Sequence, residues 1–209
     1  MRPALLLLAL LIVGCGESVT VPATGTIYGE LVYSDGQPAP NVEVLVEGED
    51  LSRFSDAEGK FVINDVLAVD ETGMGRHYVI RGRGERGDVS VGFFIEHFKV
   101  KGQQSYSVGT VVVRPTGMIS GVLLLDGATD HSGARIGIEG SSLETITRAD
   151  GGYLLEAVPA YEGYVVTCRK GGHVDMDIDT MDVDGEEVPV RVEPGSMTEL
   201  EESVLHWTS

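Results

Sequence analysis

Two stretches of the sequence are nearly alike, and they decide the fold: YGELVYSDGQPAPNVEVLVEGEDLSRFSDAEGKFVINDVLA at 28–68 and SGVLLLDGATDHSGARIGIEGSSLETITRADGGYLLEAVPA at 120–160. Matching positions lie 92 residues apart, as in 121 − 29 for the first glycines. This offset relates four clear pairs: Gly29 and Gly121, Gly48 and Gly140, Gly59 and Gly151, Val66 and Val158. Because solenoid repeats have periods of about 20–50 residues, a period this long indicates a duplicated domain.

In each copy, apolar and polar residues alternate as they do in β-strands. Val42, Val44 and Val46 alternate with polar residues, and Ile136 and Ile138 repeat the pattern in the second copy. Such alternation places one strand face in a core and the other in water. Acidic–glycine turn pairs separate the segments, at 35–36, 58–59, 126–127 and 150–151. No segment carries an apolar stripe with helical spacing, so the pattern predicts all-β sandwiches.

Further strand-like segments follow each copy. They lie at 77–84, 89–100 and 106–115 after the first copy, and at 163–171, 173–183, 188–193 and 198–207 after the second. Between the copies, Pro115 and Gly117 are expected to separate the last strand of the first domain from the first strand of the second. A joint this short predicts a semi-rigid rod rather than two freely tumbling domains.

The motifs occur in the same order in both copies. The first copy contains G-x-L-x-x-x-D-G-x-P-x-x-x-V-x-V-x-x-E from Gly29, then S-D-A-E-G-K-F and Y-V-I-R; the second contains V-L-L-L-D-G, I-G-I-E-G, T-R-A-D-G-G-Y and G-Y-V-V. This order resembles the carboxypeptidase regulatory-like domain. The resemblance implies two tandem seven-stranded, transthyretin-like β-sandwiches, at 26–115 and 116–209. The second copy departs from the pattern in Arg148, which stands where the first has Asp56, and in a long acidic strand region.

The N-terminal residues indicate export and anchoring. Ala4 to Val13 form an apolar run of 10 residues (13 − 4 + 1), shorter than the about 20 of a membrane-spanning helix and typical of a signal peptide. The run ends in I-V-G-C, which resembles the lipobox of bacterial lipoproteins. The resemblance implies that residues 1–14 are removed, that Cys15 is acylated and that 15–25 form a tether. The same resemblance favours the outer membrane over the inner membrane, because Gly16 stands where an aspartate would resemble an inner-membrane retention signal. An uncleaved signal anchor and a plain signal peptide are the alternatives.

The composition argues against anionic partners. The formal net charge is −18, from 33 acidic and 15 basic residues, so the surface repels nucleic acid and anionic lipid headgroups. With Cys15 acylated, an internal disulfide framework is excluded, because the chain has only one other cysteine. That residue, Cys168, shares a predicted strand face with Tyr164 and Val166, so we expect it to be a buried core thiol.

No catalytic or cofactor motif is present in the sequence. The five histidines are scattered singly, and neither His-Glu-x-x-His nor Cys-x-x-Cys occurs, so we expect no enzyme and no cofactor. One stretch, HVDMDIDTMDVDGEE at 173–187, has oxygen ligands in the number that calcium prefers. Its candidates are Asp175, Asp177, Asp179, Asp182, Asp184 and Glu186. Thr180 stands where a calcium loop needs glycine, so an acidic edge strand that discourages aggregation is the alternative interpretation.

Together these features predict a membrane-anchored, non-catalytic lipoprotein of the cell envelope. Its β-sandwich repeats would serve as a structural spacer or protein-binding module, with edge strands as docking surfaces for an envelope protein partner. The alternative is an envelope module that binds carbohydrate or calcium. The aromatic candidates for sugar contact are Tyr28, Tyr33, Phe54, Tyr106 and Trp207.

Overall fold

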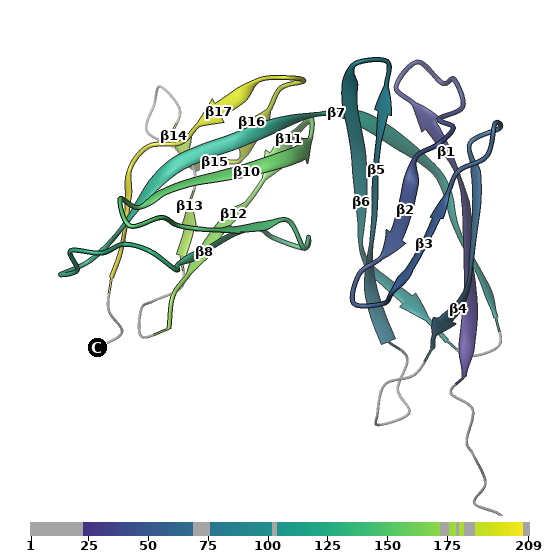
Figure 1. Cartoon of the computed structure of the whole chain (residues 1–209), viewed down its shortest axis with the longest axis horizontal. Helices are drawn as coiled ribbons and strands as arrows, with labels where there is room; N and C mark the ends of the chain where they lie inside the picture. Colours follow the sequence, from purple (N-terminus) through teal and green to yellow (C-terminus); the bar gives the residue numbers. More distant parts are fainter. Residues whose placement is uncertain are drawn as a thin grey trace, which may run out of the picture.

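The computed structural model describes residues 23–68, 76–101, 104–171, 176–178, 180–181 and 187–206, and every regular element among them is a strand (Figure 1). The strands form a first half, β1 to β6 with the first part of β7, and a second half, the rest of β7 with β8 to β18. The two halves lie next to each other along the long axis of the molecule (Figure 1). The all-β fold predicted from the alternating pattern is confirmed.

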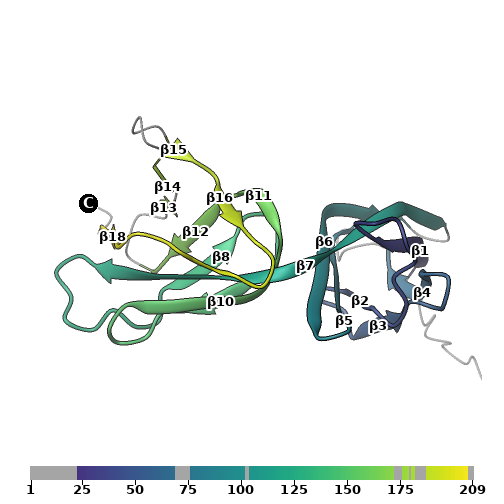
Figure 2. The same cartoon turned by 90° about the horizontal axis from the view of Figure 1, so that it is seen from above.

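The first half contains seven strands in the order β3-β2-β5-β6-β7-β1-β4. β5 and β6 form a long antiparallel hairpin, whereas β6 and β7 pair only at Val91↔Pro115 and Gly92↔Arg114. The half is therefore a sandwich of two layers, β3-β2-β5-β6 and β7-β1-β4, joined along this short seam (Figure 2). Its strands are β1 (Thr24–Tyr33), β2 (Glu43–Val46), β3 (Leu51–Phe54), β4 (Lys60–Leu67), β5 (Arg76–Arg86), β6 (Val89–Val100) and β7 (Ser105–Leu125).

The second half repeats this pairing. The second part of β7 pairs antiparallel with β10 and parallel with β17 and β18, just as β1 pairs antiparallel with β4 and parallel with β7. β8 lies between β9 and β12, as β2 lies between β3 and β5. Its strands are β8 (Arg135–Ile138), β9 (Glu144–Ile146), β10 (Gly152–Pro159), β11 (Tyr161–Tyr164), β12 (Val166–Arg169), β13 (Met176–Ile178), β14 (Thr180–Met181), β15 (Glu187–Val188), β16 (Val190–Val192), β17 (Met197–Glu199) and β18 (Ser203–Leu205).

Each half buries its own apolar core. Leu31 and Val44 are fully buried in the first, and their counterparts Leu123 and Ile136 (123 − 31 = 92 and 136 − 44 = 92) are fully buried in the second. Full burial of such a side chain contributes about 1.5–3 kcal/mol to stability. Cys168 also lies fully buried in the second core, as its position on an apolar strand face predicts. The repeat in the sequence is thus a repeat of the core.

A buried hydroxyl group holds the same loop in both halves. Ser55 Oγ donates a hydrogen bond to the carbonyl oxygen of Ala39 (2.6 Å) and accepts one from the amide of Val42 (3.0 Å). Thr147 Oγ1 makes the two equivalent bonds, also at 2.6 and 3.0 Å, to residues 92 positions further on. A buried backbone group left without a partner costs about 1–3 kcal/mol. This cost explains why a small hydroxyl residue stands at both positions.

The glycine of the following turn is required by its backbone geometry. Gly59 has φ +78° and Gly151 has φ +81°, in the left-handed region that favours glycine. A Cβ atom at Gly59 would lie 2.2 Å from the carbonyl oxygen of Leu31, and one at Gly151 would lie 2.5 Å from that of Leu123. A side chain at either position would therefore push two parts of the sandwich apart.

The aromatic residue after this turn lies over a glycine of the neighbouring strand. Phe61 is opposite Gly29, and Tyr153 is opposite Gly121. A Cβ atom at Gly121 would lie 2.4 Å from the hydroxyl oxygen of Tyr153, so the glycine makes room for the ring. The hydroxyl group of Tyr153 is buried and has no hydrogen-bond partner among the described residues. Phe61 has no such group, and this is one chemical difference between the two cores.

In both halves, a tyrosine hydroxyl group donates a hydrogen bond to a backbone carbonyl oxygen at the end of an earlier strand. The Tyr78 hydroxyl donates to the carbonyl oxygen of Leu67, and the Tyr164 hydroxyl donates to that of Pro159, both at 2.7 Å. The acceptors are 92 residues apart (159 − 67), but the tyrosines are only 86 apart (164 − 78). The second copy therefore has six fewer residues (92 − 86) between acceptor and donor. Burial raises the pKa of Tyr78 to about 12 and also raises that of Tyr164.

The joint between the halves differs from the expected break. β7 runs without interruption through Pro115 and Gly117, so these residues do not separate two strands. Pro115, which has no amide hydrogen to donate, accepts a hydrogen bond from the amide of Ala160 through its carbonyl oxygen (2.8 Å). Gly117 allows a close approach, because a Cβ atom there would lie 2.4 Å from the carbonyl oxygen of Glu193. One strand thus leaves the first sandwich and enters the second.

The segments expected to be strands are largely present. Those at 77–84, 89–100 and 106–115 correspond to β5, β6 and the first part of β7. In the second half, the segment at 163–171 is divided between β11 and β12, and that at 198–207 between β17 and β18. Short strands thus replace the long β5–β6 hairpin of the first half.

Candidate functional site

Most residues that the sequence analysis singled out for lipidation or calcium binding lie outside the described residues. Asp177 is in β13, opposite Thr167 of β12. Those outside are Cys15, Asp175, Asp179, Asp182, Asp184 and Glu186. Within the described ranges, no three His, Cys, Asp or Glu side chains gather closely enough to hold a metal ion. In the same ranges no helix has the length and apolarity needed to cross a bilayer. Lipidation and calcium binding both stay predictions.

The aromatic candidates for sugar contact are dispersed. Tyr33 is buried and Tyr106 is half-buried. Tyr28 and Phe54 are exposed, but they stand on β1 and β3, which belong to different layers of the first half. Trp207 lies outside the described residues. The four described aromatics therefore form no shared flat platform.

The open side of the first half forms a groove. Beyond Gly92, no described strand pairs with β6 on the side away from β5, and before Arg114 β7 pairs with β1 alone. Between these two edges lies a groove of about 790 Å³, closed at one end by residues of the second half. Past the other end, Phe98 and Tyr106 contact each other edge to face, with ring centroids 6.3 Å apart. We refer to this feature as the β6–β7 groove.

Both edges of the β6–β7 groove carry a β-bulge. The bulge residues are His97, with φ +52°, and Gly109, with φ +72°, and the ladder registers shift by one residue at each. In a regular strand, every second side chain faces the same way. Because each bulge adds one residue, the side chains that face the first core lie at positions i, i+2, i+5 and i+7 of each strand. The sets are Phe93, Ile95, Phe98 and Val100 on β6, and Tyr106, Val108, Val111 and Val113 on β7.

Phe94 connects the two halves at the closed end of the groove. It belongs to β6, yet it packs against the core of the second half, with its ring centroid 5.8 Å from that of Tyr164. Tyr161 lies 5.2 Å from Tyr164, and the Arg114 guanidinium lies over the Tyr161 ring at 5.6 Å. Arg114 also donates to the carbonyl oxygen of Ala160 (3.2 Å). Aromatic pairs of this kind contribute about 0.5–1.5 kcal/mol each beyond the area they bury.

Polar contacts join the halves through the turn between β8 and β9, which points toward β6 in Figure 1. The Ser142 hydroxyl donates to the carboxylate of Glu47. The carboxylate of Glu96 lies against Gly140, where a Cβ atom would collide with it. Gly140 has φ +72°, so both its backbone and its contact favour glycine. The outer face of the β2-β5-β6 layer is therefore a contact surface between the halves.

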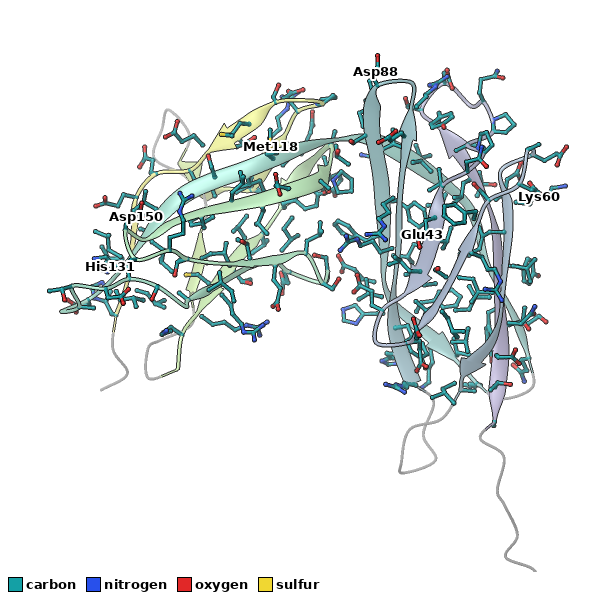
Figure 3. The ribbon with its side chains drawn as sticks, viewed as in Figure 1. Glu43, Lys60, Asp88, Met118, His131 and Asp150 are labelled. Atoms are coloured by element: carbon teal, nitrogen blue, oxygen red, sulfur yellow. The ribbon has the colours of Figure 1, made fainter. Side chains whose placement is uncertain are left out.

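A second groove, of about 620 Å³, lies on the other side of this contact. Phe54, Arg81 and Leu143 are among its lining residues. At its edge, Arg83 Nε lies 2.7 Å from a carboxylate oxygen of Glu43. Glu43 stands on β2 in the first half (Figure 3). The hydrogen bond from Arg83 holds the pKa of Glu43 below its usual range. The lining of this groove thus carries acidic and basic side chains in equal number, Glu43 and Glu85 against Arg81 and Arg83, unlike that of the β6–β7 groove.

Neither the β6–β7 groove nor the role of Phe94 was predicted from the sequence. Two adjacent aromatic residues, Phe93 and Phe94, are a usable signal, because neighbours in a strand point to opposite faces and one of them must point outward. The surface that receives Phe94 comes from the second half. Sequence alone could not place that surface.

Comparisons with known proteins assign no family to the chain. No family model and no curated protein matches it. An interface mutant of a type II cohesin–X-dockerin complex from Acetivibrio cellulolyticus is 19% identical over 43% of this chain and 56% of that chain, with TM-score 0.34. The Bacillus anthracis TIE protein is 11% identical over 89% of this chain and 34% of that one (TM-score 0.32). The shaft pilin SpaA from Lactobacillus rhamnosus GG is 10% identical over 90% of this chain and 99% of the pilin chain, with TM-score 0.25.

The chain thus spans about half the length of the cohesin–dockerin chain and a third of the TIE protein. Identities and TM-scores this low assign no function to the chain. The carboxypeptidase regulatory-like resemblance stays a prediction from the motifs.

Proposed function

We propose that the chain is a membrane-anchored, non-catalytic lipoprotein of the bacterial cell envelope, working as a stiff spacer and protein-binding module. In this proposal residues 1–14 are a signal peptide and Cys15 carries the lipid anchor, with the outer membrane as the favoured location. Residues 26–115 and 116–209 are two transthyretin-like sandwiches of the carboxypeptidase regulatory-like type. The partner is another envelope protein.

The continuous strand β7 carries the spacer part of the proposal. It contains 21 residues. At about 3.3 Å per residue, a strand of this length spans about 70 Å. Its ladder bonds reach β6 at Pro115 on one side of the joint and β10 at Thr116 on the other. Bending at the joint would break bonds in both halves and withdraw Phe94 from the second core, so the two sandwiches move as one body.

Spin labels on the two halves test this stiffness. Glu58 and Thr129 are both exposed, so cysteines at these positions can be labelled in the Cys15→Ala form of the chain while Cys168 stays buried. Pulsed electron resonance should give one narrow distance distribution. Phe94→Ala should broaden this distribution, because the packing of Phe94 into the second core is lost. Tyr28→Ala removes an exposed aromatic residue away from the joint and should leave the distribution narrow. A broad distribution in the otherwise unchanged chain would contradict the spacer role.

Mass spectrometry tests the anchor separately. The protein purified from its native membrane should have the mass of residues 15–209 plus acyl chains. Cys15→Ala should abolish this species, because only the thiol can accept the lipid. A chain that is cut elsewhere and carries no lipid would remove the anchor from the proposal and leave the spacer untouched.

A further inference from the structure

We propose that the β6–β7 groove binds an extended segment of the partner protein as an additional β-strand, and that this segment alternates apolar residues with lysine or arginine. The inference rests on the protein-binding role proposed above and names the chemistry of the partner. Its grounds are the open strand edges, the apolar floor and the charge of the rim.

The strand edges supply the main-chain part of the recognition. Among the described residues, β6 beyond Gly92 pairs with β5 alone and β7 before Arg114 pairs with β1 alone, so each presents one side of its backbone to the groove. A strand laid along such an edge satisfies backbone groups of both chains. From Val108 to Val113 the β7 edge has room for about six residues of an added strand at about 3.3 Å each.

The floor of the groove supplies pockets for alternate side chains. Ile95, Val108 and Val111 line the groove and are only half-buried, although they pack against the first core. These side chains leave one margin of the core incompletely covered. The apolar residues of an added strand, which recur at every second position, would cover that margin.

The rim determines the charge of the partner. Glu96 and Glu139 are exposed on it, and neither has an ion-pair partner among the described residues. Arg114 also lines the groove, so the rim carries two carboxylates against one guanidinium, whose own contacts go to the Tyr161 ring and the carbonyl oxygen of Ala160. Together with the formal net charge of −18, these carboxylates favour a basic segment and repel an acidic one.

The same features argue against a second copy of this chain as the occupant. A second copy carries the same charge excess and would be repelled. The bulges at His97 and Gly109 bend both edges, and the second half closes one end of the groove, so a long regular edge strand cannot lie along it. A short, separate segment fits these limits.

Fluorescence anisotropy with two synthetic peptides tests the proposal. Both have about eight residues; one alternates valine with lysine, and the other alternates valine with glutamate. The valine–lysine peptide should bind the full-length chain about tenfold or more tightly than the valine–glutamate peptide, because opposite charges face each other only in the first complex. Methylating alternate backbone nitrogens of the valine–lysine peptide should abolish binding, because it removes ladder hydrogen bonds.

Matched variants locate the binding. Removing two rim charges with E96Q and E139Q should weaken the valine–lysine peptide several-fold, and Val111→Lys should abolish its binding. The control removes two exposed charges outside the groove, with E58Q and E201Q, and a second control places a lysine on exposed β4 with Val62→Lys. Both controls should bind as the unchanged chain does.

Three results would overturn the inference. The first is that the rim and control charge variants weaken peptide binding equally. The second is that the valine–lysine peptide still binds after backbone methylation. The third is that the chain sediments as a dimer, and that Val111→Lys abolishes the dimer. The last result would make a second copy the occupant. The spacer role is tested separately by the distance measurement, so failure of peptide binding and failure of the proposed function give different results.

Discussion

The two halves share one plan where their sequences are alike and diverge where they are not. Strands β1 to β4 correspond to the second part of β7 and to β8, β9 and β10, with the same pairing partners. After that point the first half continues with the long β5–β6 hairpin, whereas the second half divides the same space among shorter strands. The repeated stretch therefore specifies a common frame, and the rest of each half is free to specialise.

The divergent part also makes much of the contact between the halves. Phe94, Glu96 and the edge of the β6–β7 groove come from the hairpin that has no long counterpart in the second half. The hairpin thus gives the first half an outer face that the second half can cover. The frame thus maintains each core and supplies the polar side of the contact through Glu47 and Ser142. The departures from the repeat add the aromatic side of the contact and the groove beside the cores.

The largest expected effect tests the shared frame. Ser55→Ala and Thr147→Val should each reduce the free energy of unfolding by about 2–5 kcal/mol, because each leaves two buried backbone groups without partners. Denaturant unfolding should show similar losses for the two variants. Ser34→Ala and Thr129→Ala remove exposed side-chain hydroxyls and serve as controls. If either variant loses no more free energy of unfolding than the controls do, the two hydroxyl groups do not stabilise their loops in the same way.

A smaller effect tests the difference between the cores. Tyr153→Phe should raise the free energy of unfolding by about 1–2 kcal/mol, because it removes a buried hydroxyl group without a partner. Phe61→Tyr should lower it in the first half. Amide hydrogen exchange, read separately for the two halves, checks both changes. If Tyr153→Phe instead destabilises the second half, the hydroxyl is satisfied in solution and the two cores are not distinguished in this way.

Alkaline pH should sharpen the same difference. Burial raises the pKa of Tyr153 to about 12. A folded-state pKa above the ordinary tyrosine value of about 10 gives stability that is complete below pH 10 and is lost as the pH rises toward 12. Tyr153→Phe should therefore reduce the alkaline loss of stability, as measured by thermal unfolding at several pH values. An unchanged alkaline profile would assign that loss to Tyr78 and Tyr164 instead.

The smallest expected effect concerns an ion pair of the first half. Arg86 Nη2 lies 2.7 Å from a carboxylate oxygen of Asp35, and this hydrogen bond, helped by the amide of Gln37, holds the pKa of Asp35 below its usual range. The stability from a lowered pKa is present above the ordinary carboxyl pKa of about 4 and is lost as the pH falls through the folded-state value. Asp35→Asn should lower the thermal midpoint slightly at neutral pH and leave it unchanged at strongly acidic pH. A difference that grows with acid would reverse the sign and contradict this account.

Much of the fold followed from the sequence alone. The offset of 92 residues, the alternation of apolar residues and the acidic–glycine turns predicted strands, turns and a duplication, because strand periodicity and turn geometry are local properties. The buried position of Cys168 followed from the same alternation. The motifs at Gly59 and Gly151 predicted tight turns, and both glycines have the positive φ that such turns require.

The path of β7 and the position of the groove were decided by the tertiary structure. Pro115 and Gly117 read as a break in the sequence, yet Ala160 and the loop at Glu193 supply contacts that make a continuous strand possible. The bulges at His97 and Gly109, and the packing of Phe94 into a distant core, depend on residues far away in the chain. Local patterns set which face of a strand is apolar. Only long-range contacts decide what covers that face and which edges stay open.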